Sequence, residues 1–119
     1  MASSPSAFEH RNLPLLLLQA RERVLARFRP VFNAHGLTDQ QWRVVRALHD
    51  RGPLEPREIG ELCCISSPSM AGMLARMEDL GLVQRERLRH DQRRVRVSLT
   101  RKSKALAAQV APLIERHLA

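Results

Sequence analysis

Cationic side chains gather in the last third of the sequence. Residues 82–104 hold nine Lys and Arg against two acids, a net charge of +7, whereas the whole chain of 119 residues carries +8. Arginine supplies 18 of the 20 cations, and its planar guanidinium binds phosphate and guanine through paired hydrogen bonds. A local concentration of this size predicts a polyanionic partner, with a solvated basic face as the simpler alternative.

Other kinds of chemistry find little support in the sequence. Cys63 and Cys64 are adjacent, which rules out a disulfide framework and favours a reducing compartment; we expect Cys63 to pack in the core. Phosphate loops, nucleophile motifs, paired carboxylates and metal-ligand spacings are absent, so we predict neither an enzyme nor a bound cofactor or metal. Without an apolar run long enough for a membrane span, or a signal sequence, we expect a cytoplasmic protein without a membrane partner.

The basic stretch must be positioned by the elements before it, and these are predicted to be helices. Apolar residues at helical spacing predict a first helix over 13–34, which His35 and Gly36 end. Thr38 caps a second helix up to residue 51, with Trp42, Val45 and Leu48 buried.

Two shorter helices follow, joined by a tight break at residues 65–66. Pro56 opens the first, whose apolar face consists of Ile59, Leu62 and Cys63. Ser67 is the expected N-cap of the second, with Pro68 as its first helical residue. Its inward residues are Met70, Met73, Leu74 and Met77. Two helices joined by so short a break form a helix-turn-helix pattern.

The periodicity changes after Gly81. Residues 82–87 and 93–99 read as two strands around a polar tip, and in the second strand apolar residues alternate with Arg94, Arg96 and Ser98. Thr100 then caps a last helix, in which Leu106, Val110, Leu113 and Ile114 share one side. Pro112 is expected to kink that helix or end its regular part. We therefore predict a mainly α fold with a small antiparallel β wing, a winged helix-turn-helix.

The sequence resembles the MarR family of winged-helix transcription regulators over roughly residues 13–108. The similarity rests on the stretches Leu-Leu-Gln-Ala-Arg-Glu (17–22), Phe-Arg-Pro (28–30), Leu-Thr-Asp-Gln-Gln-Trp-Arg-Val-Val-Arg (37–46), Pro-Ser-Met (68–70), Gly-Leu-Val (81–83), and Asp-Gln-Arg through Ser-Leu-Thr (91–100). Within the family, the chain is most similar to repressors of homoprotocatechuate (4-hydroxyphenylacetate) degradation operons. The resemblance implies a homodimer that binds a pseudo-palindromic duplex.

That resemblance divides the chain into a flexible N-terminal arm (1–12), a dimerisation helix (13–36), the winged helix-turn-helix domain (37–100) and a C-terminal dimerisation helix (101–119). Family members usually continue through another helix, so we expect the C-terminal dimerisation helix to be shortened, or the chain to be truncated or partly ordered.

Recognition of DNA is expected on the outward side of the fourth helix. The positions left outside by the inward methionines are Ser66, Ser67, Ser69, Gly72 and Arg76. Hydroxyls and backbone N–H groups at a helix N-terminus suit phosphates and base edges in the major groove. Alternatively, Ser67 serves only as a cap and Arg76 pairs with Glu78 or Asp79.

The wing is expected to enter the minor groove. By the family pattern, Asp91 orients Arg93, and Arg93 reaches into the groove, where the negative potential is enhanced. The phosphates on either side would be bound by Arg89, His90, Arg94 and Arg96. Surface ion pairs are the alternative role for these arginines.

Arg21 interrupts an otherwise apolar seam formed by positions 18, 25, 28 and 32 of the first helix. An inward guanidinium needs a partner, either a carboxylate across the dimer or the carboxylate of a bound aromatic acid. The resemblance favours a phenolic acid such as homoprotocatechuate or 4-hydroxyphenylacetate, held between the dimer helices and the winged domain. Its other expected contacts are His10, Arg11, Trp42, Arg46 and His49.

Together these expectations describe a repressor of an aromatic-acid catabolic operon that a small phenolic acid releases from DNA. The alternatives are a redox-responsive or ligand-independent regulator, and a winged module that binds an acidic protein. An RNA-binding domain is a further alternative, although the chain has only four aromatic residues, too few for a stacking platform.

Overall fold

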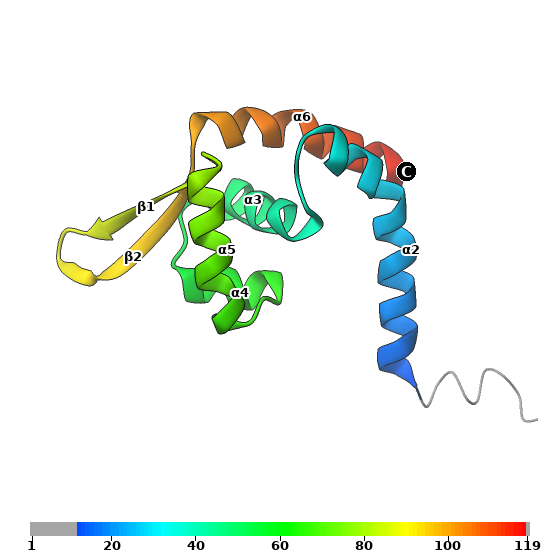
Figure 1. The fold of residues 1–119 in the computed structure, drawn as a ribbon, viewed down its shortest axis with the longest axis horizontal. Helices are drawn as coiled ribbons and strands as arrows, with labels where there is room; N and C mark the ends of the chain where they lie inside the picture. The colour runs from blue at the N-terminus through cyan, green and yellow to red at the C-terminus, as the bar shows by residue number, and fades with distance from the viewer. Residues whose placement is uncertain (1–11, 119) are drawn as a thin grey trace, which may run out of the picture.

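The computed structural model describes residues 12–118 and has five helices and one two-stranded antiparallel sheet (Figure 1). The predicted fold class, mainly α with a small β wing, is confirmed. All but the last residue of the predicted N-terminal arm lies outside the described residues. No helix in this part of the chain is both long and apolar enough to cross a membrane. The elements are α2 (Leu13–Ala34), α3 (Asp39–Arg51), α4 (Pro56–Cys63), α5 (Ser67–Asp79), β1 (Val83–Leu88), β2 (Asp91–Leu99) and α6 (Arg101–Leu118).

Helix α2 has the predicted bounds and extends away from the rest of the molecule (Figure 1). It ends where Gly36 adopts a φ of 69°, a left-handed conformation that glycine adopts without steric cost. Only Phe28 and Phe32, in the half nearer the C-terminus, are buried. Phe28 packs against His117 near the end of α6, with ring centroids 6.1 Å apart.

Helix α3 is the central element of the core. A capping box fixes its start, because Thr38 accepts a hydrogen bond from the Gln41 backbone while the Gln41 side chain accepts one from the Thr38 backbone. The predicted inward residues Trp42, Val45 and Leu48 are all buried.

The helix-turn-helix consists of α4 and α5, joined by a tight turn at residues 64–66. Cys64 adopts a left-handed φ of 56°, and the Ile65 N–H donates to the Gly60 carbonyl across the turn. Gly60 lets the two segments approach, since a Cβ there would lie 3.0 Å from the Ile65 carbonyl oxygen. Ile59 and Cys63 are buried as predicted. Leu62, predicted to share their apolar face, is 45% exposed, because this two-turn helix turns only the Ile59 and Cys63 side inward.

The predicted cap of α5 was wrong by one residue. The N-cap is Ser66, not Ser67: the Ser66 backbone is extended, and its carbonyl accepts the first helical hydrogen bonds, from the N–H groups of Ser69 and Met70. Ser67 is therefore the first helical residue. Met70, Leu74 and Met77 are buried and Met73 is partly buried, as the helical spacing predicted.

The wing has a shorter tip than the sequence predicted. The strands reach Leu88 and start again at Asp91, which leaves a two-residue turn at Arg89 and His90. The strands extend past the predicted ends because Leu88 pairs with Asp91, beyond an irregularity in the pairing between residues 87 and 88. The wing is joined to the rest of the fold at Leu54, which pairs with Val97 through backbone hydrogen bonds of 3.0 and 2.7 Å.

Helix α6 continues through Pro112, which neither ends it nor leaves its later part unpacked. Val110 and Ile114 are buried on either side of the proline, and their packing compensates for the hydrogen bond that proline cannot donate. Thr100 is tied to the start of the helix by hydrogen bonds with Ser103, and its hydroxyl donates to the Gly81 carbonyl at 2.6 Å.

Candidate nucleic-acid interface

One face of α5 is free of the core. All five residues predicted for recognition, Ser66, Ser67, Ser69, Gly72 and Arg76, are exposed. The Ser66 hydroxyl donates to the Ser69 hydroxyl at 3.1 Å, which leaves the Ser69 proton available to a partner. Glu78, a candidate partner for Arg76, binds Arg85 instead, and no ion pair among the described residues involves Arg76.

The N-terminus of α5 is electrostatically prepared for an anion. Helices α3 and α4 begin with side-chain capping boxes, whereas no side-chain cap closes α5. The first turn of α5 contains no acidic residue. Pro68 has no N–H group and the Ser69 N–H donates to the Ser66 carbonyl, so the Ser67 N–H and the positive end of the helix dipole are what this end of α5 offers to a DNA phosphate.

The six arginines of the wing differ in their partners. Arg85 binds Glu78 of α5 with Nη2–Oε1 at 2.8 Å, and Arg94 binds Glu55 before α4 with distances of 3.0 and 2.7 Å. Arg87 donates to the Gln92 carbonyl within the wing. In the described part of the chain, no carboxylate lies within ion-pair distance of the others, Arg89, Arg93 and Arg96.

The Arg94–Glu55 and Arg85–Glu78 pairs change the pKa values of the two glutamates. The hydrogen bond from Arg94 holds the pKa of the Glu55 carboxyl below its ordinary value, against the opposing effect of desolvation. The hydrogen bond from Arg85 lowers the pKa of Glu78 in the same way. Both carboxylates are therefore charged and paired at neutral pH.

Asp91 shapes the tip of the wing. Its carboxylate accepts a hydrogen bond from the Arg93 backbone N–H at 3.0 Å, a local turn that fixes where the Arg93 side chain leaves the strand. The Arg93 side chain itself is exposed. The predicted orienting role of Asp91 thus has a structural basis in the backbone.

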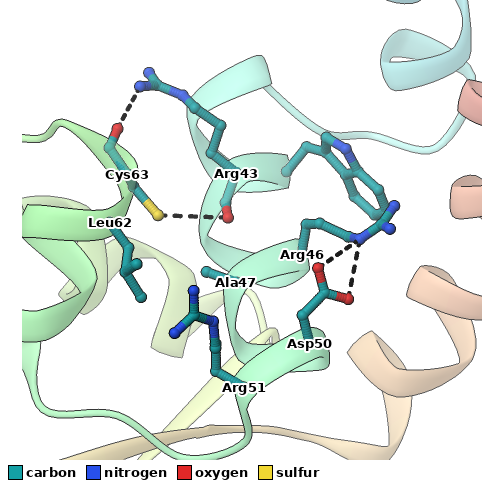
Figure 2. Close-up of a pocket in the computed structure, with 8 residues that line it drawn as sticks. Arg43, Arg46, Ala47, Asp50, Arg51, Leu62 and Cys63 are labelled. Atoms are coloured by element: carbon teal, nitrogen blue, oxygen red, sulfur yellow. Dashed lines mark hydrogen bonds and ion pairs between the residues drawn. The ribbon is translucent and has the colours of Figure 1, made fainter. Parts of the chain in front are cut away.

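A second candidate site is a pocket of about 300 Å³ between α3 and α4 (Figure 2). Two predicted ligand contacts, Trp42 and Arg46, line it. Arg46 is held by Asp50, with Nε 3.1 and 3.0 Å from the two carboxylate oxygens. The remaining lining residues are Arg43, Ala47, Asp50, Arg51, Leu62 and Cys63.

The sequence predicted that Arg21 faces inward along the apolar seam of α2, but in the structure it does not. Its side chain is 43% exposed, and Nη2 lies 3.0 Å from a carboxylate oxygen of Asp39, on α3 of the same chain. The partner is thus within the chain because Asp39, in the first turn of α3, lies opposite the middle of α2. Asp39 also lies 3.8 Å from Arg43 of the pocket.

The other predicted ligand contacts do not join this pocket. His49 lines a separate hollow with Pro53, Leu99 and Lys104, on another side of α3. His10 and Arg11 lie outside the described residues.

Sequence reasoning missed three residues of these sites: Arg43, Arg51 and Glu55. Arg43 and Arg51 could have been found from their spacing, because Arg43 lies three positions before Arg46, and Arg51 lies eight positions, about two turns, after Arg43. Arg51 has no ion-pair partner among the described residues, and its guanidinium points toward Leu62 and Ala47 in Figure 2. Glu55 gave no local signal, since its partner is 39 positions away.

Cys63 is a core residue, as expected. Its thiol donates to the Arg43 carbonyl at 3.5 Å, and burial raises its pKa, which keeps it protonated and unreactive. Arg43 in turn donates to the Cys63 carbonyl at 2.6 Å, so the two residues link α3 to the end of α4 (Figure 2).

The helix-turn-helix with an arginine-bearing wing defines a winged-helix DNA-binding protein. Comparison with known proteins agrees, since residues 35–94 match the MarR family. The homoprotocatechuate degradative operon repressor of Escherichia coli is 42% identical over 106 residues, which cover 89% of this chain and 72% of the relative. The chain therefore belongs to the MarR family of transcriptional regulators, which are not enzymes.

Two solved structures have similar folds. NadR in complex with 4-hydroxyphenylacetate has a TM-score of 0.85 and 35% identity, covering 99% of this chain and 82% of that one. Reduced AbfR bound to DNA has a TM-score of 0.77 and 26% identity, covering 93% and 82%.

Proposed function

We propose that this protein is a repressor of an aromatic-acid catabolic operon and that a small phenolic acid releases it from DNA. The observation that carries the proposal is the pocket between α3 and α4, where three arginines meet an apolar wall. Homoprotocatechuate and 4-hydroxyphenylacetate are the proposed ligands. The names of the Escherichia coli repressor and of the NadR complex support this choice.

The pocket has the chemistry that a phenolic acid needs. Trp42, Ala47 and Leu62 offer apolar surface for an aromatic ring. Arginine binds a carboxylate through paired, charge-assisted hydrogen bonds. Arg51 would accept the acid group most readily, because Arg46 is already paired with Asp50. Arg21 would act at a distance, through Asp39 and Arg43.

DNA would be bound by α5 and the wing together. Ser66, Ser67, Ser69, Gly72 and Arg76 would face the major groove, and Arg93, oriented by Asp91, would enter the minor groove. Arg89 and Arg96 would bind phosphates, since neither has a carboxylate partner in the described part of the chain. Such a protein would act in the cytoplasm, where bacterial DNA lies.

We further propose that the protein binds its operator as a homodimer. On α2, whose N-terminal half extends away from the rest of the molecule, Leu13, Leu17 and Val24 form an exposed apolar stripe at helical spacing. Helices α2 and α6 would then form the dimer base, and residues 37–100 the DNA-binding domain. Ligand would favour a dimer geometry in which the recognition helices no longer match the half-site spacing.

The test is fluorescence anisotropy on a duplex that spans the promoter of the protein's own gene, titrated with both phenolic acids. Ligand binding is read independently from the fluorescence of Trp42, the single tryptophan of the chain. We expect tight duplex binding that the phenolic acids reverse. In Arg51→Gln, release should need at least about ten-fold more ligand, the loss of a charge-assisted hydrogen bond.

His49→Gln is the matched control, because His49 lies on α3 outside the pocket. It should respond as the parent does. Duplex binding that ignores both phenolic acids would overturn the ligand assignment and leave the DNA-binding role. An absence of duplex binding would overturn the repressor assignment itself.

A further inference from the structure

We propose that Glu55 and Arg94 position the wing, and that Arg94 therefore does not contact DNA. The inference goes beyond the proposed function because it separates two adjacent arginines of the wing, Arg93 and Arg94, into different roles. Arg93 reaches the duplex, whereas Arg94 holds β2 at the angle from which Arg93 can do so.

Glu55 lies where the wing meets the helix-turn-helix. It follows Leu54, whose backbone pairs with Val97 of β2, and it precedes α4 as the N-cap residue. The Glu55 backbone N–H donates to Glu58 at 3.0 Å, so the position of the residue is fixed from the helix side as well. Its carboxylate receives both Nε and Nη2 of Arg94.

Strand β1 is also joined to the helix-turn-helix by an arginine–glutamate pair. Arg85 of β1 donates through Nε and Nη2 to Glu78 near the end of α5, at 3.3 and 2.8 Å. Each strand is thus joined by one arginine to one helix of the helix-turn-helix. Arg85 pairs with Val97 near the base of the wing, whereas Arg94 lies in the half of β2 nearer the tip, beside Arg93.

The angle at which the wing leaves the helix-turn-helix determines where Arg93 lies. Six strand residues span roughly 20 Å, so a rotation of about 10° at the base moves the tip by about 3 Å. A displacement of that size is enough to break a hydrogen bond between Arg93 and a base or phosphate. The Glu55–Arg94 pair is therefore expected to affect DNA binding through Arg93.

Arg94 is also a poor candidate for a phosphate contact. Its guanidinium already has a bidentate carboxylate partner, and a phosphate would have to replace that partner. Arg93, beside it in β2, has no carboxylate partner in the described part of the chain.

The direction in which one substitution changes the affinity for DNA tests the proposal. Glu55→Gln keeps an oxygen acceptor for the cap of α4 but removes the charge that holds Arg94. If the pair positions the wing, Glu55→Gln weakens binding to the promoter duplex by about five-fold or more, the loss of one good base contact. If Arg94 contacts phosphate, the same substitution removes a competitor and strengthens binding, which would overturn the proposal.

Glu86→Gln is the matched control for the loss of a negative charge near DNA. Glu86 is an exposed residue of β1 and forms no ion pair with any described residue. Its substitution should leave binding unchanged or strengthen it slightly. Weakening by Glu86→Gln equal to that by Glu55→Gln would show a general effect of charge and contradict a positioning role.

Two further variants keep the test decisive if Glu55→Gln alters the fold, which thermal unfolding reports. Arg94→Gln combined with Glu55→Gln should bind no more weakly than either single variant, since both remove the same pair. The exchange Glu55→Arg with Arg94→Glu should recover most of the binding that Arg94→Glu alone loses. A double exchange as weak as Arg94→Glu would show that position 94 itself contacts the phosphates.

Discussion

At the scale of single residues, the partner of an arginine determines what it can do. Arg21, Arg85 and Arg94 each have a carboxylate within 3.0 Å, whereas Arg93 has only the turn that Asp91 makes with its backbone. A guanidinium that already has a carboxylate gains little from a phosphate, and an unpaired one gains the full interaction. The basic stretch is therefore a mixture of arginines with carboxylate partners and arginines that have none among the described residues.

The two carboxylates at the base of the wing should titrate at unusually low pH. Because hydrogen bonds from arginine lower the pKa values of Glu55 and Glu78, each pair is complete above the ordinary glutamate pKa and is lost as the pH falls through the lowered value. Carbon-detected NMR of the side-chain carboxyls should show both midpoints below the ordinary value.

Arginine substitutions supply the control for this titration. In Arg94→Gln the Glu55 midpoint should rise while that of Glu78 stays where it was, and Arg85→Gln should do the reverse. A Glu55 midpoint that Arg94→Gln leaves unchanged would show that the pair does not form in solution.

The sequence predicted the exposure of the residues that we propose to face DNA, but not the ion pairs. Exposure follows from local periodicity, which places Ser69 and Arg76 opposite the buried methionines. Pairs such as Arg21–Asp39 and Glu55–Arg94 join residues 18 and 39 positions apart, and only the packing of whole elements brings them together. For the same reason, His49 could not be separated from Trp42 and Arg46.

At the scale of elements, the bounds of the helices were predictable wherever one residue gives the signal. Thr38 marks the start of α3 and Gly36 marks the end of α2, and the structure agrees. The start of α5 was misplaced because Ser66 and Ser67 are both good caps, and the choice depends on which carbonyl accepts the first helical bond. Strand ends were misplaced because cross-strand pairing determines them.

Gly60 should be required for the approach of α4 to the turn that follows it. In Gly60→Ala the new Cβ would lie 3.0 Å from the Ile65 carbonyl oxygen, a backbone atom that cannot move without shifting the turn. Overpacking of this kind costs about 1–3 kcal/mol, which offsets or exceeds the helix preference of alanine, about 1 kcal/mol.

Gly72→Ala is the matched control, because a Cβ at that position meets no atom within 4 Å. Urea unfolding followed by circular dichroism should rank Gly72→Ala as equal to or more stable than the parent, and Gly60→Ala as less stable than Gly72→Ala. Equal stability of the two variants would show that the turn accommodates the methyl group without cost.

At the scale of the whole molecule, the shape itself suggests a second chain. In Figure 1, α2 extends from near the end of α6 away from the helix-turn-helix and the wing. Its N-terminal half contacts little of the molecule and leaves Leu13, Leu15, Leu17 and Leu18 more than 40% exposed. Periodicity predicts such a helix, but it does not say what covers the apolar side, because that depends on a second copy.

The dimer should therefore depend on the apolar stripe of α2. Leu17, 61% exposed, is the middle residue of that stripe, and burying a leucine side chain contributes about 1.5–3 kcal/mol. A charge at the centre of the stripe would have to be desolvated in the interface, so Leu17→Glu should weaken dimerisation by at least about ten-fold.

Leu80→Glu is the matched control, since Leu80 is 41% exposed but follows α5, in the DNA-binding domain. Sedimentation equilibrium over a range of protein concentrations should show a dimer for the parent and for Leu80→Glu, and dissociation for Leu17→Glu. Because two linked half-site contacts bind far more tightly than one, Leu17→Glu should also lose most of its affinity for a duplex with both half-sites. A parent that sediments as a monomer, or a Leu17→Glu variant as dimeric as Leu80→Glu, would show that the stripe is not the dimer interface.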